Sequence, residues 1–166
     1  MVEEQLTQTA ALQDGEAAGA IAGAISGALG DQAPVSEVIE LRPSAFSAKV
    51  KQHGRHPTHY GRMENPDAQA VKVGWCGEVM EMYLRLRGEQ IVESSFWADG
   101  CLSTMACGDM LMTLVQDKSV DDALTIAPEA LILALDGLPF SSHHCAELSV
   151  ETFRAAVASR QEGSDI

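Results

Sequence analysis

The chain has 166 residues, of which 46% are hydrophobic, and its 24 acidic residues outnumber its 11 basic ones. This length suits one domain of ordinary size, and the hydrophobic content is sufficient to build a core. The net charge of -13 argues against a protein that binds nucleic acid or an anionic membrane, because either partner would be repelled.

Membrane insertion and export are also disfavoured by the sequence. No hydrophobic run approaches the roughly 20 residues that a membrane-spanning helix needs. The N-terminus, MVEEQ, lacks the basic region of a signal peptide. We therefore expect a cytoplasmic protein. In a reducing compartment, four cysteines indicate metal binding or reactive thiols rather than disulfide bonds.

The first part of the chain, residues 1–42, differs in composition from the rest. It carries seven acidic residues against one arginine, and it contains no aromatic residue, cysteine or histidine. Gly19, Gly23 and Gly27 recur every fourth residue in an alanine-rich stretch that is too short to span a membrane. We expect residues 1–42 to form a flexible acidic extension and residues 43–166 to form the folded domain.

The folded part is predicted to begin with a helix and a β-hairpin. Residues 44–50 start with a capping serine and place Phe46 and Val50 on one face of a short amphipathic helix. Residues 80–87 alternate apolar and polar side chains, which is the pattern of a strand with one wet face. Gly88-Glu89 is predicted to be the turn, and residues 91–97 the returning strand.

Helices follow the hairpin. We expect one from Ser103 to about Val115, a short one opened by Ser119, one over residues 128–135, and a last one over residues 144–160. A hairpin followed by helices predicts an α+β fold, with a small antiparallel sheet of about three strands and the helices packed on one of its faces.

Three of the four cysteines lie where these predicted elements meet. Cys76 precedes the first strand of the hairpin, Cys101 follows the second, and Cys145 begins the last helix with His144 beside it. Loops at the ends of rigid elements commonly present ligands, and a helix N-terminus stabilises a thiolate. Three thiols and an imidazole suit either tetrahedral zinc or an iron–sulfur centre.

These residues resemble the NifU/IscU-type scaffold proteins for iron–sulfur cluster assembly, over about Phe46 to Ala158. The resemblance is carried by three local motifs in the same order along the chain, Cys76-Gly77-Glu78, Gly100-Cys101 and His144-Cys145. The stretches Phe46 to Val50 and His56 to Gly61 are similar to the N-terminal helix of that family and the segment after it. The implied fold is the SufE/NifU-like α+β fold.

The resemblance implies a scaffold and carrier rather than an enzyme. Such a protein takes persulfide sulfur from a cysteine desulfurase, binds iron, assembles a transient 2Fe–2S cluster and transfers it to apo iron–sulfur proteins. Cys76, Cys101 and Cys145 would be cluster ligands and sulfur acceptors, and Glu78 and His144 candidates for the fourth ligand. Zinc can occupy the same set of ligands. The resemblance also allows a homodimer that bridges one cluster.

The sequence departs from the family pattern at two places. Glu78 stands where the family normally has aspartate, and of the family's Leu-Pro-Pro-Val-Lys segment only Leu138-Pro139 remains. The spacing from Cys101 to Cys145 resembles the scaffold branch, because the zinc-dependent branch has an insertion there. A zinc-dependent sulfurtransferase of the SufU type, acting as a persulfide acceptor, is therefore the alternative function.

The remaining candidate ligands are expected to have structural roles. Cys107 follows Cys101 by about 600° of helix rotation, so the two should not share a face. His53, His56 and His59 could form a second metal site, although a polar loop is the preferred interpretation.

Overall fold

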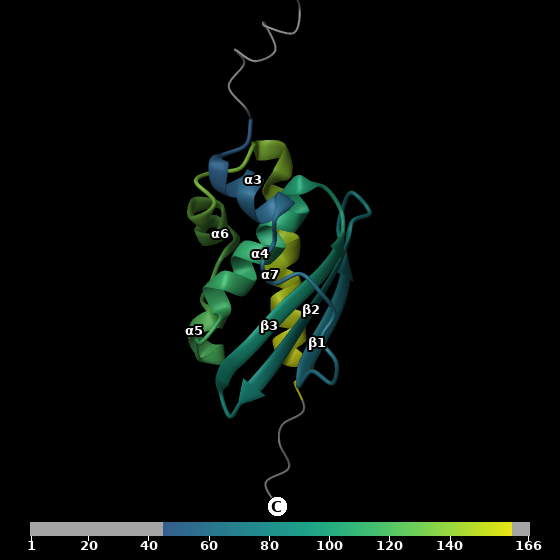
Figure 1. Cartoon of the computed structure of the whole chain (residues 1–166), viewed down its shortest axis with the longest axis vertical. Coiled ribbons are helices and arrows are strands. Elements are labelled where there is room, and N and C mark those ends of the chain that lie inside the picture. The colour runs from purple at the N-terminus through teal and green to yellow at the C-terminus, as the bar shows by residue number, and fades with distance from the viewer. Residues whose placement is uncertain (1–44, 161–166) are drawn as a thin grey trace, which may run out of the picture. The chain divides into compact units, whose positions relative to one another are not determined.

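The computed structural model describes residues 45–160, which lie within one compact unit of the chain. The predicted extension, residues 1–42, lies outside the described residues. Figure 1 shows a sheet with helices against it. The elements, in chain order, are α3 (Ala48–Arg55), β1 (Ala68–Val73), β2 (Val79–Arg87), β3 (Gln90–Asp99), α4 (Leu102–Val115), α5 (Val120–Leu124), α6 (Pro128–Ala134), a 3-10 turn (Phe140–Ser142) and α7 (His143–Ala158).

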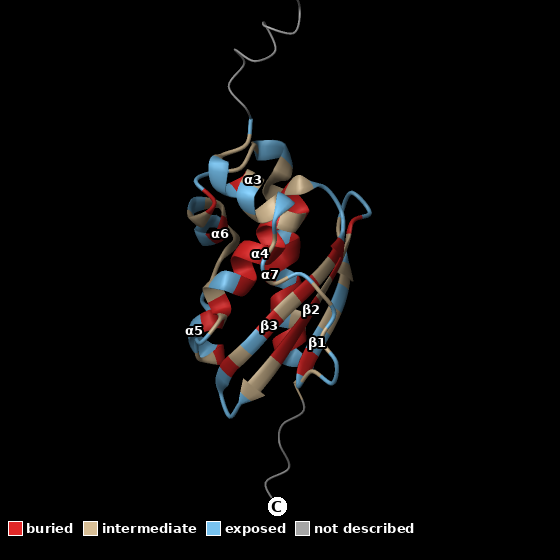
Figure 2. Ribbon diagram, viewed as in Figure 1, coloured by how far each residue is buried: buried red, intermediate tan, exposed pale blue. Residues whose placement is uncertain are grey.

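The sheet is antiparallel throughout, in the order β1-β2-β3. Side chains of β2 alternate as the sequence predicted, so that Met80, Met82 and Leu84 all point toward the helices and are fully buried. Phe96 of β3 joins them in the core. α7 packs on β1 and β2 and α4 packs on β3, and Figure 2 shows buried residues along these helices and the strands they face. The predicted α+β fold is confirmed.

About three strands were expected from the sequence, but the position of β1 was not predicted. Ala68 is buried, whereas Val71 and Val73 are exposed, so this edge strand has small residues inward and apolar residues outward. That arrangement reverses the usual hydrophobic pattern, and alternation alone could not locate it.

Two helix starts differ from the sequence prediction. The first described helix is capped by Ser47, whose Oγ accepts a hydrogen bond from the Val50 amide at 3.0 Å. α4 starts at Leu102 with Cys101 as its N-cap residue, so Ser103 is not the cap. Ser119 caps α5 as predicted, because its Oγ accepts from the amide of Asp122. Placing Cys101 at the helix boundary matters for the site below.

A short extended segment before the sheet covers the outer edge of β3. The amide of Gly61 donates to the Phe96 carbonyl at 2.7 Å, and the Phe96 amide donates to the His59 carbonyl at 3.0 Å. The edge of β3 is therefore partly paired with a segment from the N-terminal side of the domain.

Asp109, in the middle of α4, is a fully buried carboxylate that ties this segment to the core. Its Oδ1 accepts hydrogen bonds from the amides of Thr58 at 2.7 Å and His59 at 2.8 Å. Its Oδ2 lies 2.6 Å from Nδ1 of His53. Two of the three histidines considered as a second metal site thus contact one aspartate, and they fix the segment before the sheet onto α4.

The structure has no helix, among the residues it describes, that is long and apolar enough to cross a membrane.

Replacing Asp109 with alanine should lower the free energy of unfolding by about 2–3 kcal/mol, because two backbone amides and the His53 imidazole lose a buried charged acceptor. Urea denaturation of the full chain measures this. Asp121→Ala, at an exposed position of α5, is the control and should change the stability by less than about 0.5 kcal/mol. Equal effects of the two substitutions would show that the buried carboxylate does not anchor the fold.

Candidate metal centre

Three chain junctions meet at one end of the sheet. The register pairs Val73 of β1 with Val79 of β2, and Val79 with Asp99 of β3. The loop that carries Cys76 and the junction that carries Cys101 therefore lie at the same end of neighbouring strands. The first turn of α7, which packs on β1 and β2, brings His144 and Cys145 to this end.

The loop between β1 and β2 is a tight turn whose shape depends on its glycines. The amide of Gly74 donates to the Glu78 carbonyl at 2.7 Å, and the amide of Gly77 donates to the Gly74 carbonyl at 3.0 Å. Gly77 has a φ of +85°, which favours glycine. A Cβ at Gly74 would lie 2.5 Å from Cδ of Glu78, so the absent side chain makes room for that carboxyl group.

Within this loop and α7, Cys76, Glu78 and His144 form a compact set of ligand atoms, all within 4.8 Å of one another. Nε2 of His144 lies 3.3 Å from Sγ of Cys76 and 3.4 Å from Oε1 of Glu78. A thiolate, an imidazole and a carboxylate at this spacing can close around one metal ion, for example zinc or iron.

The Glu78 carboxylate is the most informative group of the set. Its side chain is buried, yet neither Oε1 nor Oε2 has a hydrogen-bond partner among the described residues. Burying a carboxylate without a hydrogen bond is costly, whereas binding a cation compensates for that cost. The environment of Glu78 therefore fits a metal ligand.

The other two cysteines lie beside this set and are linked by a threonine. Sγ of Cys145 is 3.5 Å from Nε2 of His144. Oγ1 of Thr104 lies 3.4 Å from Sγ of Cys101 and 3.6 Å from Sγ of Cys145. The two sulfurs thus share one hydroxyl group, and through Cys145 they reach the Cys76, Glu78 and His144 set.

The two linked thiols differ in acidity. Burial raises the pKa of Cys101, but hydrogen bonding by the Thr104 hydroxyl, together with the backbone amides of Thr104 and Ser103 and the Cys145 thiol, outweighs it, so this pKa lies below its ordinary value. Burial is also the main reason why the pKa of Cys145 is raised to about 12. Cys101 is exposed to solvent, whereas Cys145 is buried, so Cys101 is the better nucleophile of the pair.

All five residues predicted from the sequence lie at this end of the sheet. The close set contains Cys76, Glu78 and His144, while Cys101 and Cys145 are adjacent to it. Thr104 was missed, although a residue three positions after an N-cap residue in a helix returns to the side of that residue. That spacing would have been a usable signal.

The remaining candidates lie away from the site or contribute no ligand. Cys107 is buried in the core, and its burial raises its pKa well above the ordinary value. Trp75, beside Cys76, is 89% exposed, and its ring lies edge-on to that of His144 with 6.3 Å between the ring centroids. Met80 and Met82 are fully buried and belong to the core.

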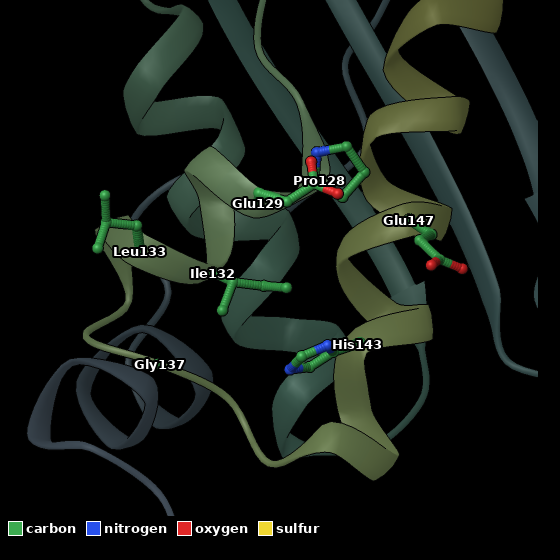
Figure 3. Close-up of a pocket in the computed structure, with 7 residues that line it drawn as sticks. All are labelled: Pro128, Glu129, Ile132, Leu133, Gly137, His143 and Glu147. Carbon is green, nitrogen blue, oxygen red and sulfur yellow. The ribbon is translucent and has the colours of Figure 1, made fainter.

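His143 lines a separate groove instead of the cysteine site. Its Nε2 lies 3.2 Å from the Leu138 carbonyl oxygen. Figure 3 shows this ring on α7 opposite Ile132 of α6, in a groove to which none of the five predicted ligands contributes. The two adjacent histidines of the HHC sequence therefore serve different parts of the surface.

Residues 45–164 of the sequence match the family described as NifU-like N terminal domain. The chain belongs to the NifU-like N-terminal domain family, which confirms the resemblance inferred from the sequence.

Relatives and solved structures agree with this assignment. The chain is 31% identical over 114 residues to the iron-sulfur cluster assembly scaffold protein IscU 1 of Archaeoglobus fulgidus, covering 68% of this chain and 74% of that protein. It is 31% identical over 119 residues to the scaffold protein IscU of Escherichia coli, covering 69% of this chain and 92% of that protein.

The fold is shared with a NifU-like N-terminal protein from Brucella abortus, with a TM-score of 0.58 at 17% identity, covering 71% of this chain and 95% of that one. A scaffold protein described as SufU from Fervidobacterium islandicum has a TM-score of 0.59 at 17% identity, covering 68% of this chain and 96% of that one. At this identity the likeness concerns the fold alone.

Because the pKa of Cys101 is lowered, its thiolate should form at pH values at which an ordinary thiol, with a pKa of about 8.5, is still protonated. Cys145 and Cys107, with raised pKa values, should remain protonated and slow to react. Alkylation of metal-free protein with iodoacetamide at a series of pH values, followed by mass spectrometry of each cysteine peptide, measures the order. Alkylation of Cys145 ahead of Cys101 would contradict this description of the site.

Proposed function

We propose that the protein is a scaffold and carrier on which an iron–sulfur cluster is assembled and from which it is transferred to apo-proteins. The observation that carries the proposal is the Cys76, Glu78 and His144 set, in which a buried carboxylate lacks any hydrogen-bond partner among the described residues. The family and the names of the relatives support it independently. In this role the chain is a carrier and not an enzyme.

The donor set suits a cargo that is bound and then released. Cys76, Cys101 and Cys145 supply soft thiolates, which bind iron and clusters strongly. Glu78 and His144 supply a harder oxygen and a nitrogen donor, whose bonds to cluster iron are weaker than those of thiolates. We assign the exchangeable position to these two residues and the retained positions to the cysteines, with a 2Fe–2S cluster as the cargo.

Sulfur acceptance belongs to Cys101 in this proposal. Its thiolate attacks the outer sulfur of a persulfide on a cysteine desulfurase; the donor's S–S bond breaks, a new S–S bond forms on Cys101, and the donor leaves as a thiolate. The exposure and the lowered pKa of Cys101 support this assignment. Reduction of the bound sulfur to sulfide takes two electrons per sulfur from an external reductant such as a dithiol.

A zinc-dependent persulfide acceptor of the SufU type is the second candidate function. It is favoured by the same three-residue set, since a thiolate, an imidazole and a carboxylate are ordinary zinc ligands. The two functions differ in their cargo, which is a cluster in one and a single sulfur atom in the other. We also predict a cytoplasmic location, and a homodimer that bridges one cluster.

Anaerobic reconstitution of the full chain with ferric iron, sulfide and a thiol should give a coloured protein with iron and sulfide in near-equal amounts. Cys76→Ser, Cys101→Ser and Cys145→Ser should each lose most of the cluster, because each removes a thiolate ligand. Metal analysis and absorption spectra measure this. Cys107→Ser is the matched control, and cluster retention is expected because that thiol lies in the core.

A wild-type protein that stays colourless under these conditions, retains stoichiometric zinc and accepts sulfur only with zinc bound would reject the scaffold proposal in favour of the second function. A cluster that survives all three of the cysteine substitutions would also reject it, because the site would then lie elsewhere.

His144→Ala should weaken zinc binding by at least about tenfold, since it removes the donor nearest to Cys76 and Glu78. The neighbouring His143→Ala removes the same kind of side chain from the separate groove and should leave zinc affinity unchanged. Competition with a chromogenic chelator compares the two variants. A larger loss for His143→Ala would show that the wrong histidine had been assigned to the site.

A further inference from the structure

Thr104 is an uncharged residue whose side chain contacts two of the candidate ligands. It is buried in the first turn of α4, at 1% exposure. Its Oγ1 lies within hydrogen-bonding distance of the sulfurs of both Cys101 and Cys145. A buried hydroxyl usually has a hydrogen-bond partner, and the two partners of this one are both sulfur atoms.

The Thr104 side chain lies directly against the backbone of Gly100. A Cβ at Gly100 would lie 2.8 Å from Cβ, Cγ2 and Oγ1 of Thr104, which is closer than real contacts allow. The threonine side chain therefore occupies the space that any larger residue at position 100 would need. Glycine at position 100 thus leaves room for the side chain that places Oγ1 beside the two sulfurs.

The chemistry of a hydroxyl decides what it does once metal is bound. A threonine hydroxyl carries one donor hydrogen and two acceptor lone pairs. In the free protein it can donate to one sulfur and accept from the other. When both sulfurs bind metal as thiolates, neither offers a hydrogen, so the hydroxyl can only donate to a ligand sulfur.

We infer that Thr104 is a positioning residue that lies between the Cys101 and Cys145 sulfurs and donates its single hydrogen bond to one of them when they bind metal. The inference rests on the proposed function in so far as it treats both cysteines as ligands. Hydrogen bonds to ligand sulfurs withdraw electron density from the metal–thiolate bond and raise the reduction potential of a cluster. Thr104 thus makes the Cys101 and Cys145 side of the site a weaker electron donor than bare thiolates would be.

The alternative is that Thr104 merely fills space beneath Gly100. Thr104→Val separates the two roles, because valine keeps the shape of threonine and lacks the hydroxyl. Thr104→Ser keeps the hydroxyl and loses the methyl group, and it should rescue the wild-type properties. Thr113→Val, at an exposed position of the same helix, is the matched control for the exchange of a hydroxyl for a methyl group.

Cobalt(II) is the probe, because cobalt bound by thiolates gives a sulfur-to-metal charge-transfer band. A hydrogen bond to the thiolate stabilises the sulfur electrons and moves that band to shorter wavelength. We expect the band of Thr104→Val to lie at longer wavelength than that of the wild type, with Thr104→Ser and Thr113→Val unchanged. Circular dichroism confirms folding of each variant, and Thr104→Ala replaces the valine variant if that one does not fold.

Reconstituted cluster gives a second readout, since Thr104→Val should have a lower reduction potential than the wild type. The inference is overturned if Thr104→Val retains the wild-type band and potential, if Thr104→Ser behaves like Thr104→Val, or if cobalt in the wild type shows no thiolate band. Failure of the wild type to form a cluster would instead reject the scaffold function, while a Thr104-dependent cobalt band would still establish the hydroxyl at the metal site.

Discussion

The Glu78 carboxylate is buried where the β1–β2 loop meets the start of α7, and no hydrogen bond among the described residues compensates for its lost hydration. Its position depends on the missing side chain of Gly74 and on the tight turn between them. The imidazole of His144 approaches the same oxygen at 3.4 Å. A cation at this point would bind to the carboxylate and compensate for its lost hydration.

The three thiols of the site differ in their exposure to solvent. Cys76 is exposed and close to His144, Cys101 is exposed and linked through Thr104, and Cys145 is buried between them. Exposed thiols can receive sulfur or iron from a partner, whereas the buried thiol can keep hold of the cargo. A site with both kinds of ligand fits a protein that must be filled and later emptied.

Much of the fold could be predicted from the sequence because the signals are local. Alternation located β2, the Gly88-Glu89 turn indicated β3 as the returning strand, and Ser119 marked the start of α5. The position of β1 was not predicted, because its exposed positions hold valines. The predicted start of α4 was wrong, because a cysteine occupies the N-cap position in place of a serine.

The site shows the same limit. Cys76, Cys101 and Cys145 could be singled out because they lie at junctions between elements, and the family resemblance added Glu78 and His144. The isolation of the Glu78 carboxylate and the sharing of one hydroxyl by two sulfurs could not be predicted, because both depend on packing between segments far apart in the chain.

In the proposed function, the site binds a cluster and then transfers it to an apo-protein. The most direct measurement mixes the loaded protein with an apo-ferredoxin under anaerobic conditions and follows the circular dichroism of the holo-ferredoxin as it forms. We expect the circular dichroism signal of the holo-ferredoxin to grow as that of the loaded protein falls. An excess of chelator should not abolish the transfer. Retention of the cluster by the loaded protein, with no ferredoxin signal, would contradict the account.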